Sequence, residues 1–257
     1  MLHAMRKGSV DAQADNSAAG IVHLACKDKK CHLLLAATGS VATMKLESVI
    51  NGLAMHNNLS IRVILTSAAE HFLGGQAPRD GQPSVADIRR LPNVDGIYTD
   101  AAEWTRPWIR GAPILHIELR RWADLMIICP LSANSMAKMV AGICDNLVLS
   151  VVRAWDADGS LDFGEGASAN RKLKGKRKIV VALAMNTAMW SHPITASHIR
   201  VLEEDWGGRD GWIEVLRPIP KMLACGDSGN GAMVEWEEIV AVAEARLGLG
   251  QTPIGTP

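Results

Sequence analysis

Two side chains in this sequence have the chemistry to move protons. His116 stands between apolar residues at the start of a helical pattern, and an imidazole exchanges protons near neutral pH. Cys225 lies in a segment with three glycines, where a thiol is accessible, whereas a structural cysteine usually lies among apolar side chains. Taken alone, the pattern leaves a structural, hydrogen-bonded role open for His116 and a non-catalytic role open for Cys225.

Small and hydrogen-bonding residues follow several apolar runs, at the points where strands of a sheet would end. They are Thr38-Gly39-Ser40, Thr66-Ser67-Ala68, Pro130 to Ser135 and Met185 to Trp190. Because a ligand of an open α/β sheet binds at the carboxyl ends of the strands, these residues indicate one shared crevice. The backbone N–H groups of Gly39–Val41 and the Ser40 hydroxyl suit a phosphate, with an ordinary strand-to-helix turn as the alternative. Asn134 and Asn186 suit helix caps equally well.

The apolar pattern predicts the elements that position these residues. Strands are predicted at 32–37, 60–65, 125–129, 178–184 and 212–216. Most of them are continuous apolar runs, which suit a sheet covered by helices on both faces. Helices are predicted over 41–56, 66–72, 116–124, 146–155, 195–206 and 235–247. The alternation predicts a doubly wound, mostly parallel α/β sheet.

The chain of 257 residues has room for one large domain, predicted at 31–248. Residues 1–30 are small, polar and aperiodic, which predicts a disordered N-terminal tail, and a C-terminal tail is predicted at 249–257. The segment 156–177 has little to bury and is expected to be an exposed insertion. A surface excursion that could act as a flap is expected at 74–95, and a mobile glycine-rich loop at 222–233.

Composition argues against several classes of function. The 27 basic and 27 acidic residues give a formal net charge of zero, so no general attraction to nucleic acid or to an anionic membrane is expected. No apolar run approaches the roughly 20 residues of a membrane helix, and the first thirty residues lack a signal-peptide core, which predicts a cytoplasmic protein. The five cysteines include no CxxC pair, so neither a disulfide framework nor a metal site is expected.

Four motifs resemble, in order, those of the flavin-dependent cysteine decarboxylases. They are TGSVA at 38–42, PLSANS at 130–135, AMNTAMW at 184–190 and ACGDSGNGAM at 224–233. HIELRRWAD before the central strand and CDNL after it extend the resemblance, which covers the chain from about Cys31 to Leu247. Within that family, the motifs are most similar to those of the eukaryotic phosphopantothenoylcysteine decarboxylases.

The resemblance implies a flavodoxin-like fold, a homotrimer with FMN at subunit boundaries, and no metal. The implied reaction is decarboxylation of 4′-phosphopantothenoylcysteine to 4′-phosphopantetheine in coenzyme A biosynthesis. The resemblance makes His116 the catalytic base and Cys225 the proton donor. Implied substrate-binding residues are Asn186, Met189, Ala224 and Gly229. Implied FMN-binding residues are Gly39, Ser40, Val41, Thr66, Ser67, Ser132, Ala133, Asn134, Ser135 and Ala184.

Two alternatives accompany this interpretation. Some fungal relatives, the halotolerance-type proteins, inhibit a Ser/Thr protein phosphatase; they typically carry long acidic tails, whereas the C-terminal tail here is short and nearly uncharged. Flavin prenyltransferases share the fold and the cofactor, but AMNTAMW and ACGDSGNGAM favour a cysteinyl substrate.

The chain departs from the family pattern at Leu183, where a proline is usual, and in the long insertion at 156–177. The sequence leaves open whether the trimer contains one kind of chain.

Overall fold

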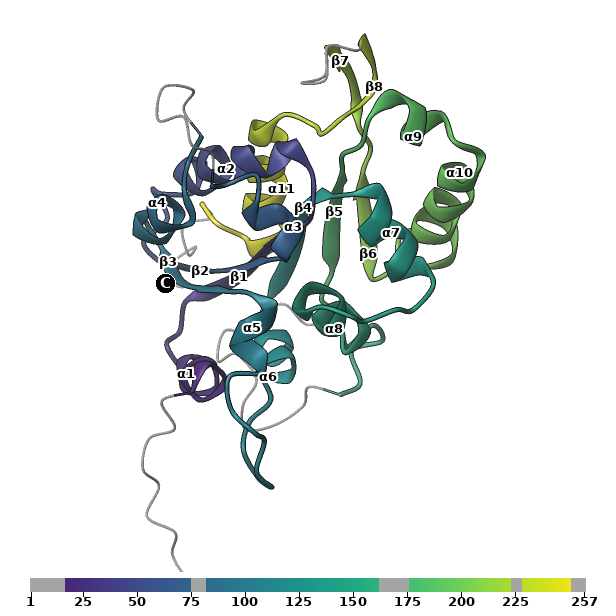
Figure 1. Cartoon of the computed structure of the whole chain (residues 1–257). Helices are drawn as coiled ribbons and strands as arrows, with labels where there is room; N and C mark the ends of the chain where they lie inside the picture. The colour runs from purple at the N-terminus through teal and green to yellow at the C-terminus, as the bar shows by residue number, and fades with distance from the viewer. Residues whose placement is uncertain (1–16, 75–81, 162–175, 223–227, 251–257) are drawn as a thin grey trace, which may run out of the picture.

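A six-stranded parallel sheet lies at the centre of this computed structural model, which describes residues 17–74, 82–161, 176–222 and 228–250 (Figure 1). The strands are β1 (Cys31–Ala37), β2 (Leu59–Leu65), β3 (Val94–Tyr98), β4 (Leu125–Leu131), β5 (Ile179–Leu183) and β6 (Ile213–Leu216). Their order in space is β3-β2-β1-β4-β5-β6, and each neighbouring pair is parallel. The predicted doubly wound α/β sheet is confirmed.

Helices cover both faces of this sheet. One face packs against α1 (Ala18–Ala25), α5 (Asp100–Glu103), α6 (Leu115–Trp122), α7 (Ala133–Val140), α8 (Leu147–Arg153), α10 (Pro193–Arg200) and η2 (Val201–Asp205). The other face packs against η1 (Val41–Lys45), α2 (Leu46–Gly52), α3 (Ser67–Glu70), α4 (Val85–Arg90) and α11 (Trp236–Leu247). Because it lies between two apolar layers, β4 is buried along its whole length, as its apolar sequence predicts. Across the described ranges, the helices are too short or too polar to cross a lipid bilayer.

The winding of the sheet reverses between β1 and β4. After β1 the chain moves towards one edge through β2 and β3, and after β4 it moves towards the opposite edge through β5 and β6. The connections after β1 and β4 therefore diverge, and open α/β sheets bind ligands at such a point. An antiparallel hairpin of β7 (Ile219–Met222) and β8 (Ser228–Ala232) extends beyond this end of the sheet, beside α9 (Thr187–Ser191) (Figure 1).

The predicted disordered tail at 1–30 is wrong for residues 17–30. Here α1 packs against α6, and its side of the contact includes Val22 and Cys26, which are fully buried. The helix forms because its short apolar run covers a face of α6, a contact that is not visible from the polar composition around it. Residues 1–16 lie outside the described structure.

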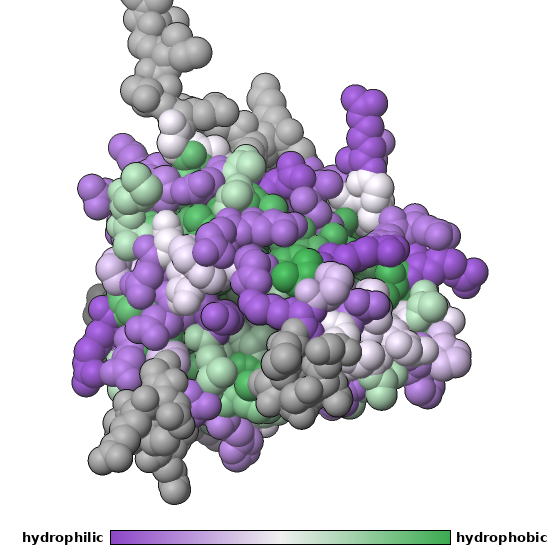
Figure 2. All heavy atoms as spheres, turned by 90° about the horizontal axis from the view of Figure 1, so that it is seen from above, coloured by the Kyte–Doolittle hydropathy of each residue, from purple (hydrophilic) through white to green (hydrophobic). Residues whose placement is uncertain are grey.

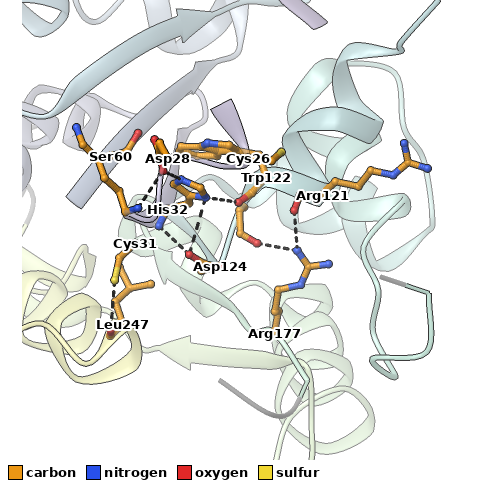
Figure 3. A network of polar contacts seen from close by, with 12 residues as sticks. Cys26, Asp28, Cys31, His32, Ser60, Arg121, Trp122, Asp124, Arg177 and Leu247 are labelled. Carbon is orange, nitrogen blue, oxygen red and sulfur yellow. Dashed lines mark hydrogen bonds and ion pairs between the residues drawn. The ribbon is translucent and has the colours of Figure 1, made fainter. Parts of the chain in front are cut away.

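A polar network fixes the chain between α1 and β1 (Figure 3). The imidazole of His32 is fully buried and stacks on the Trp122 ring, with 4.5 Å between ring centroids. One ring nitrogen lies 2.9 Å from the Trp122 carbonyl oxygen, and the other lies 2.7 Å from a carboxylate oxygen of Asp28. The backbone N–H of His32 donates to Asp124 at 2.9 Å. These contacts anchor the amino end of β1 to the end of α6.

The prediction of an exposed insertion is wrong at both ends of 156–177. Asp156 is buried, and its carboxylate accepts hydrogen bonds from the backbone N–H groups four and five residues later, at 3.0 and 3.1 Å. Arg177 donates to the Ala123 carbonyl oxygen at 2.8 Å, beside the network in Figure 3. The segment therefore begins with a turn closed on the buried Asp156 carboxylate, and it ends with a polar contact between Arg177 and the domain. Residues 162–175 lie outside the described structure.

Two other segments contain more regular structure than the sequence predicts. The surface excursion expected at 74–95 contains α4, whose Ile88 is buried, and leads into β3. The loop expected at 222–233 contains β8. Neither strand has the continuous apolar run that marks a central strand, because β3 is only partly buried and β8 contains two glycines. Residues 75–81 and 223–227 lie outside the described structure.

Candidate active site

A cavity of about 490 Å³ lies at the carboxyl ends of β1, β4 and β5. Loops from both halves of the sheet line it, together with the β7–β8 hairpin and the start of α11. The cavity brings together the predicted residues Gly39, Ser40, Val41, Ser132, Ala133, Asn134, Ala184, Asn186 and Met189. Figure 2 shows the molecule from the top of Figure 1, where apolar surface is bordered by hydrophilic surface. A cavity of this size suits a small organic ligand.

Thr38 joins the two strands at which the winding reverses. Its backbone N–H and its hydroxyl each lie 3.0 Å from the carbonyl oxygen of Pro130, to which they donate. The same hydroxyl accepts a hydrogen bond from the backbone N–H of Ser132 at 2.8 Å. Thr38 is fully buried, so these bonds hold the Gly39–Ser40 turn and the start of α7 on adjacent walls of the cavity.

Three predicted residues begin helices at the cavity. The Ser40 and Ser132 side chains accept hydrogen bonds from backbone N–H groups at the starts of η1 and α7. The Asn186 side-chain oxygen accepts from the Met189 backbone N–H at 2.8 Å and so caps α9. This bond occupies the oxygen of Asn186 and leaves its NH₂ group as a hydrogen-bond donor at the cavity wall.

Four of the predicted residues lie near the cavity without lining it. Thr66 caps α3 through its hydroxyl, which accepts from the Ala69 N–H at 3.2 Å, and the next residue, Ser67, is exposed. Ser135 is buried against the Ser132 hydroxyl. Gly229, in β8, contacts the turn after β5. Thr66 and Ser135 thus position the loops around the cavity rather than forming its surface.

The hairpin packs on the turn that carries Asn186. The Met185 N–H donates to the Gly231 carbonyl oxygen at 2.9 Å. A Cβ atom at Gly229 would lie 1.9 Å from the Thr187 hydroxyl oxygen, so only glycine permits this approach. Cys225 and the preceding Ala224, predicted in the connection between β7 and β8, lie outside the described residues.

The candidate base His116 does not line the cavity. It lies in the first turn of α6, where Nδ1 is hydrogen-bonded to the carboxylate of Glu103 in α5. Glu103 is almost fully buried, whereas the His116 side chain is 26% exposed. A carboxylate on Nδ1 fixes the orientation of the ring and leaves Nε2 for a reacting group. Within one chain, His116 therefore lies outside the cavity that Asn186 lines, although the family resemblance assigns both residues to one active site.

Sequence reasoning missed several residues that the fold places here. Glu103 is thirteen residues from His116, and only tertiary structure pairs them. Lys45, Lys221 and Glu235 line the cavity from three separate elements. Lys45 follows Val41 by one helical turn, and this spacing is a local signal that could have placed it at the cavity. Lys221 and Glu235 reach the cavity only because of where the hairpin folds.

The lining is suited to a flavin. Backbone N–H groups and hydroxyls gather at the ends of β1 and β4, and they suit a phosphate and a polyol. The other walls are mainly apolar and include Met44, Met185 and Trp236, which suit a planar ring system. The Gly39 turn is closely packed, since a Cβ atom there would lie 2.7 Å from the Ala68 Cβ. In the described residues, no cluster of three or more His, Cys, Asp or Glu side chains could hold a metal ion.

Comparison with known sequences agrees with this description. The Flavoprotein family model matches residues 22–248. A mouse phosphopantothenoylcysteine decarboxylase is 38% identical over 221 residues, which cover 86% of this chain and 89% of the mouse protein. A probable thymidylate synthase of Schizosaccharomyces pombe is 39% identical over 88% of this chain, which spans 31% of that longer protein.

Solved structures show the same fold. A PPC decarboxylase mutant complexed with pantothenoylaminoethenethiol has a TM-score of 0.65 and 37% identity over 84% of this chain and 97% of that one. The FMN-binding protein AtHal3 has a TM-score of 0.63 and 36% identity, over 84% of this chain and 96% of that one. With its family match, its fold and its cavity in agreement, this chain belongs to the Flavoprotein family.

Proposed function

We propose that this protein catalyses the FMN-dependent decarboxylation of 4′-phosphopantothenoylcysteine to 4′-phosphopantetheine in coenzyme A biosynthesis. The observation that carries the proposal is the cavity in which the Gly39–Ser40 turn, the start of α7 and Asn186 meet. The similarity to phosphopantothenoylcysteine decarboxylases over most of their length supports it.

Each cavity wall has a separate task in this proposal. Backbone N–H groups at Gly39–Val41 and the hydroxyls of Ser40 and Ser132 hold the flavin. FMN held by these groups would supply a reversible two-electron acceptor for the substrate's CH₂–SH group. The Asn186 NH₂ group donates to the substrate carboxylate, which orients the bond that breaks.

Two proton transfers complete the reaction. His116, held by Glu103, accepts a proton through Nε2 when the substrate is oxidised. The Cys225 thiol, in the segment between β7 and β8, gives a proton to the carbon that CO₂ has left. These assignments follow from the family resemblance and from the side-chain chemistry.

We propose that the protein is a homotrimer, in which His116 of one chain completes the cavity of a neighbour. The support is the position of His116 away from the cavity of its own chain. The segment between α5 and α6, next to His116, exposes Trp104, Trp108 and Ile109 at 78%, 58% and 72%, as expected of a surface that another chain covers. We also propose a cytoplasmic location, where an exposed free thiol such as that of Cys144 stays reduced.

One assay tests the proposed function. Purified protein is loaded with FMN, its flavin absorbance is recorded, and 4′-phosphopantothenoylcysteine is added while CO₂ and 4′-phosphopantetheine are followed by mass spectrometry. We expect one CO₂ for each product molecule, with flavin bound throughout. Protein that binds flavin and forms no product would contradict the proposal. A pull-down with a Ser/Thr phosphatase catalytic subunit, followed by an inhibition curve, would then test the regulatory alternative.

A further inference from the structure

The short helix α5, which packs beside α6, carries two carboxylates that each hold the start of another helix (Figure 1). Asp100 is its first residue and accepts a hydrogen bond from the backbone N–H of Leu147 at 2.7 Å, where α8 begins. Glu103 is its last residue and accepts from the backbone N–H of His116 at 3.4 Å, in the first turn of α6. The first N–H groups of a helix lack partners within it, so carboxylates stabilise helix starts. The two residues thus share one structural task.

Glu103 has a further contact that the structure does not give to Asp100. Its Oε1 atom is hydrogen-bonded to Nδ1 of the His116 ring as well as to the backbone N–H of His116. An ionised carboxylate can only accept hydrogen bonds, so the ring proton lies on Nδ1 and the free electron pair lies on Nε2. Two hydrogen bonds to one oxygen therefore set the direction of the imidazole.

The charge of Glu103 is buried next to this ring. The Glu103 side chain is 4% exposed, and His116 is its only ion-pair partner in the part of the chain that the structure describes. Glu118 is buried to the same extent, but it contacts both His23 and Arg121. A buried charge is stabilised mainly by an opposite charge in contact with it. The negative charge of Glu103 therefore lies where a positive charge forms when Nε2 takes a proton.

We infer that Glu103 is a positioning residue for the proton transfer to His116, and that its charge as well as its hydrogen bond accelerates this step. The inference rests on the proposed function. In the step, the S–H bond of the substrate thiol breaks, its electron pair stays on sulfur, and the proton forms a bond with Nε2. Glu103 keeps the other ring nitrogen protonated, so that Nε2 is the base, and it balances the charge of the imidazolium.

Asp100 provides the matched control for this inference. Both carboxylates belong to α5, and both accept from an N–H group at the start of a helix. If Glu103 served the fold alone, its removal and that of Asp100 would have similar effects. Only the contact with the imidazole distinguishes the two residues, so a difference between their variants measures what that contact does.

The first experiment follows the oxidation step in FMN-loaded protein. 4′-Phosphopantothenoylcysteine is mixed with each variant without oxygen, and the loss of oxidised-flavin absorbance gives the rate. Glu103→Gln keeps the size and an acceptor oxygen but not the charge, so the rate should fall at least about tenfold. Glu103→Leu should be slower still, and Glu103→Asp, which keeps the charge, should recover part of the loss. KM should change less than about twofold, because Glu103 acts through His116 and not on the substrate.

The second experiment needs no turnover. Nitrogen-15 NMR of histidine-labelled protein shows which ring nitrogen carries the proton, and the signals of His116 are identified by their loss in His116→Asn. The substrate-free parent should have its proton on Nδ1 of His116, and Glu103→Leu should move it towards Nε2. Asp100→Asn should keep both the parent signals and the parent rate. Circular dichroism, flavin absorbance and size-exclusion chromatography check that each variant folds, binds flavin and assembles.

The possible results lead to different conclusions. An active parent whose Glu103→Gln variant oxidises the substrate at the parent rate contradicts the inference alone. A loss of rate that is equal in Glu103→Gln and Asp100→Asn also overturns it, and assigns both carboxylates to the helix starts. A parent with the His116 proton on Nε2 overturns it as well. A parent that binds flavin and forms no product contradicts the proposed function, and the inference fails with it.

Discussion

Asn186 uses the two atoms of its amide group in different ways. Its oxygen caps α9 by accepting from the Met189 N–H at 2.8 Å, and its NH₂ group is the proposed donor to the substrate carboxylate. The sequence alone left capping and ligand binding as equal alternatives for this residue. In the structure the two roles are compatible, because each uses a different atom.

An aspartate at this position should separate the two roles. Asn186→Asp keeps a capping oxygen, so we expect the melting temperature to stay close to that of the parent. It removes the NH₂ donor and sets a negative charge against the substrate carboxylate, which should lower kcat/KM at least about 100-fold. Asn146→Asp, at the matching cap of α8, should leave kcat/KM unchanged. A large loss of thermal stability in Asn186→Asp would show that the cap needs the amide.

Buried thiols make stability sensitive to alkaline pH. Burial raises the pKa of Cys26 from 9.0 to about 11 and that of Cys129 to about 12. Because the unfolded chain loses these protons first, the free energy of unfolding should fall as pH rises from about 9 to about 11. Urea unfolding at a series of pH values measures this slope. Cys26→Ala should reduce it, and Cys144→Ala, at an exposed thiol, should not; equal slopes in parent and Cys26→Ala would contradict the explanation.

At the scale of elements, Thr38 links the two halves of the sheet. Its buried hydroxyl both donates to Pro130 and accepts from the Ser132 N–H. The loops after β1 and β4 would otherwise be joined at this point by fewer hydrogen bonds. Two of the three hydrogen bonds that join these cavity walls at Thr38 are therefore made by one hydroxyl.

Removal of this hydroxyl should affect both stability and flavin binding. Thr38→Val leaves the Ser132 N–H and part of the Pro130 carbonyl unpaired, which should cost about 1–3 kcal/mol in the free energy of unfolding. It should also weaken FMN binding, because the two walls lose their common partner. Thr38→Ser, which keeps the hydroxyl, should retain most of both properties. Denaturant unfolding and a flavin titration measure them; unchanged FMN affinity in Thr38→Val would refute the link.

The elements that could be predicted from sequence are those buried on both faces. β4 is buried along its whole length, so its sequence is apolar throughout and recognisable. β3 and β8 lack a continuous apolar run. β3 is partly exposed, and β8 packs through Gly229 and Gly231, which lie against Thr187 and Met185. Residues at strand ends were predictable because parallel strands gather them at one edge. Contacts such as Glu103 with His116, or Lys221 with Glu235, depend on the tertiary fold and left no local pattern.

At the scale of the whole molecule, the separation of His116 from the cavity predicts that two defective chains can complement one another. His116→Asn and Asn186→Asp chains, each inactive alone, are unfolded together and refolded as a mixture. If each cavity takes its histidine from a neighbour, random assembly gives about a quarter of the cavities both functional residues. The mixture should then recover about a quarter of the parent activity. A mixture with no activity, although it forms trimers, would place both residues in one chain.

The two ends of the segment between α8 and β5 come close together. A Cβ atom at Gly159 would lie 3.8 Å from the Cα atom of Lys176, and Asp156 and Arg177 fix the chain on either side. Closely spaced ends allow a folded guest to be inserted with little loss of chain entropy. The substrate cavity lies at the carboxyl ends of the strands, whereas Arg177 lies at the amino end of β5. A fluorescent reporter domain spliced between Leu161 and Lys176 would keep both N–H groups that donate to Asp156, and would therefore give a tagged enzyme whose catalytic edge carries no foreign sequence.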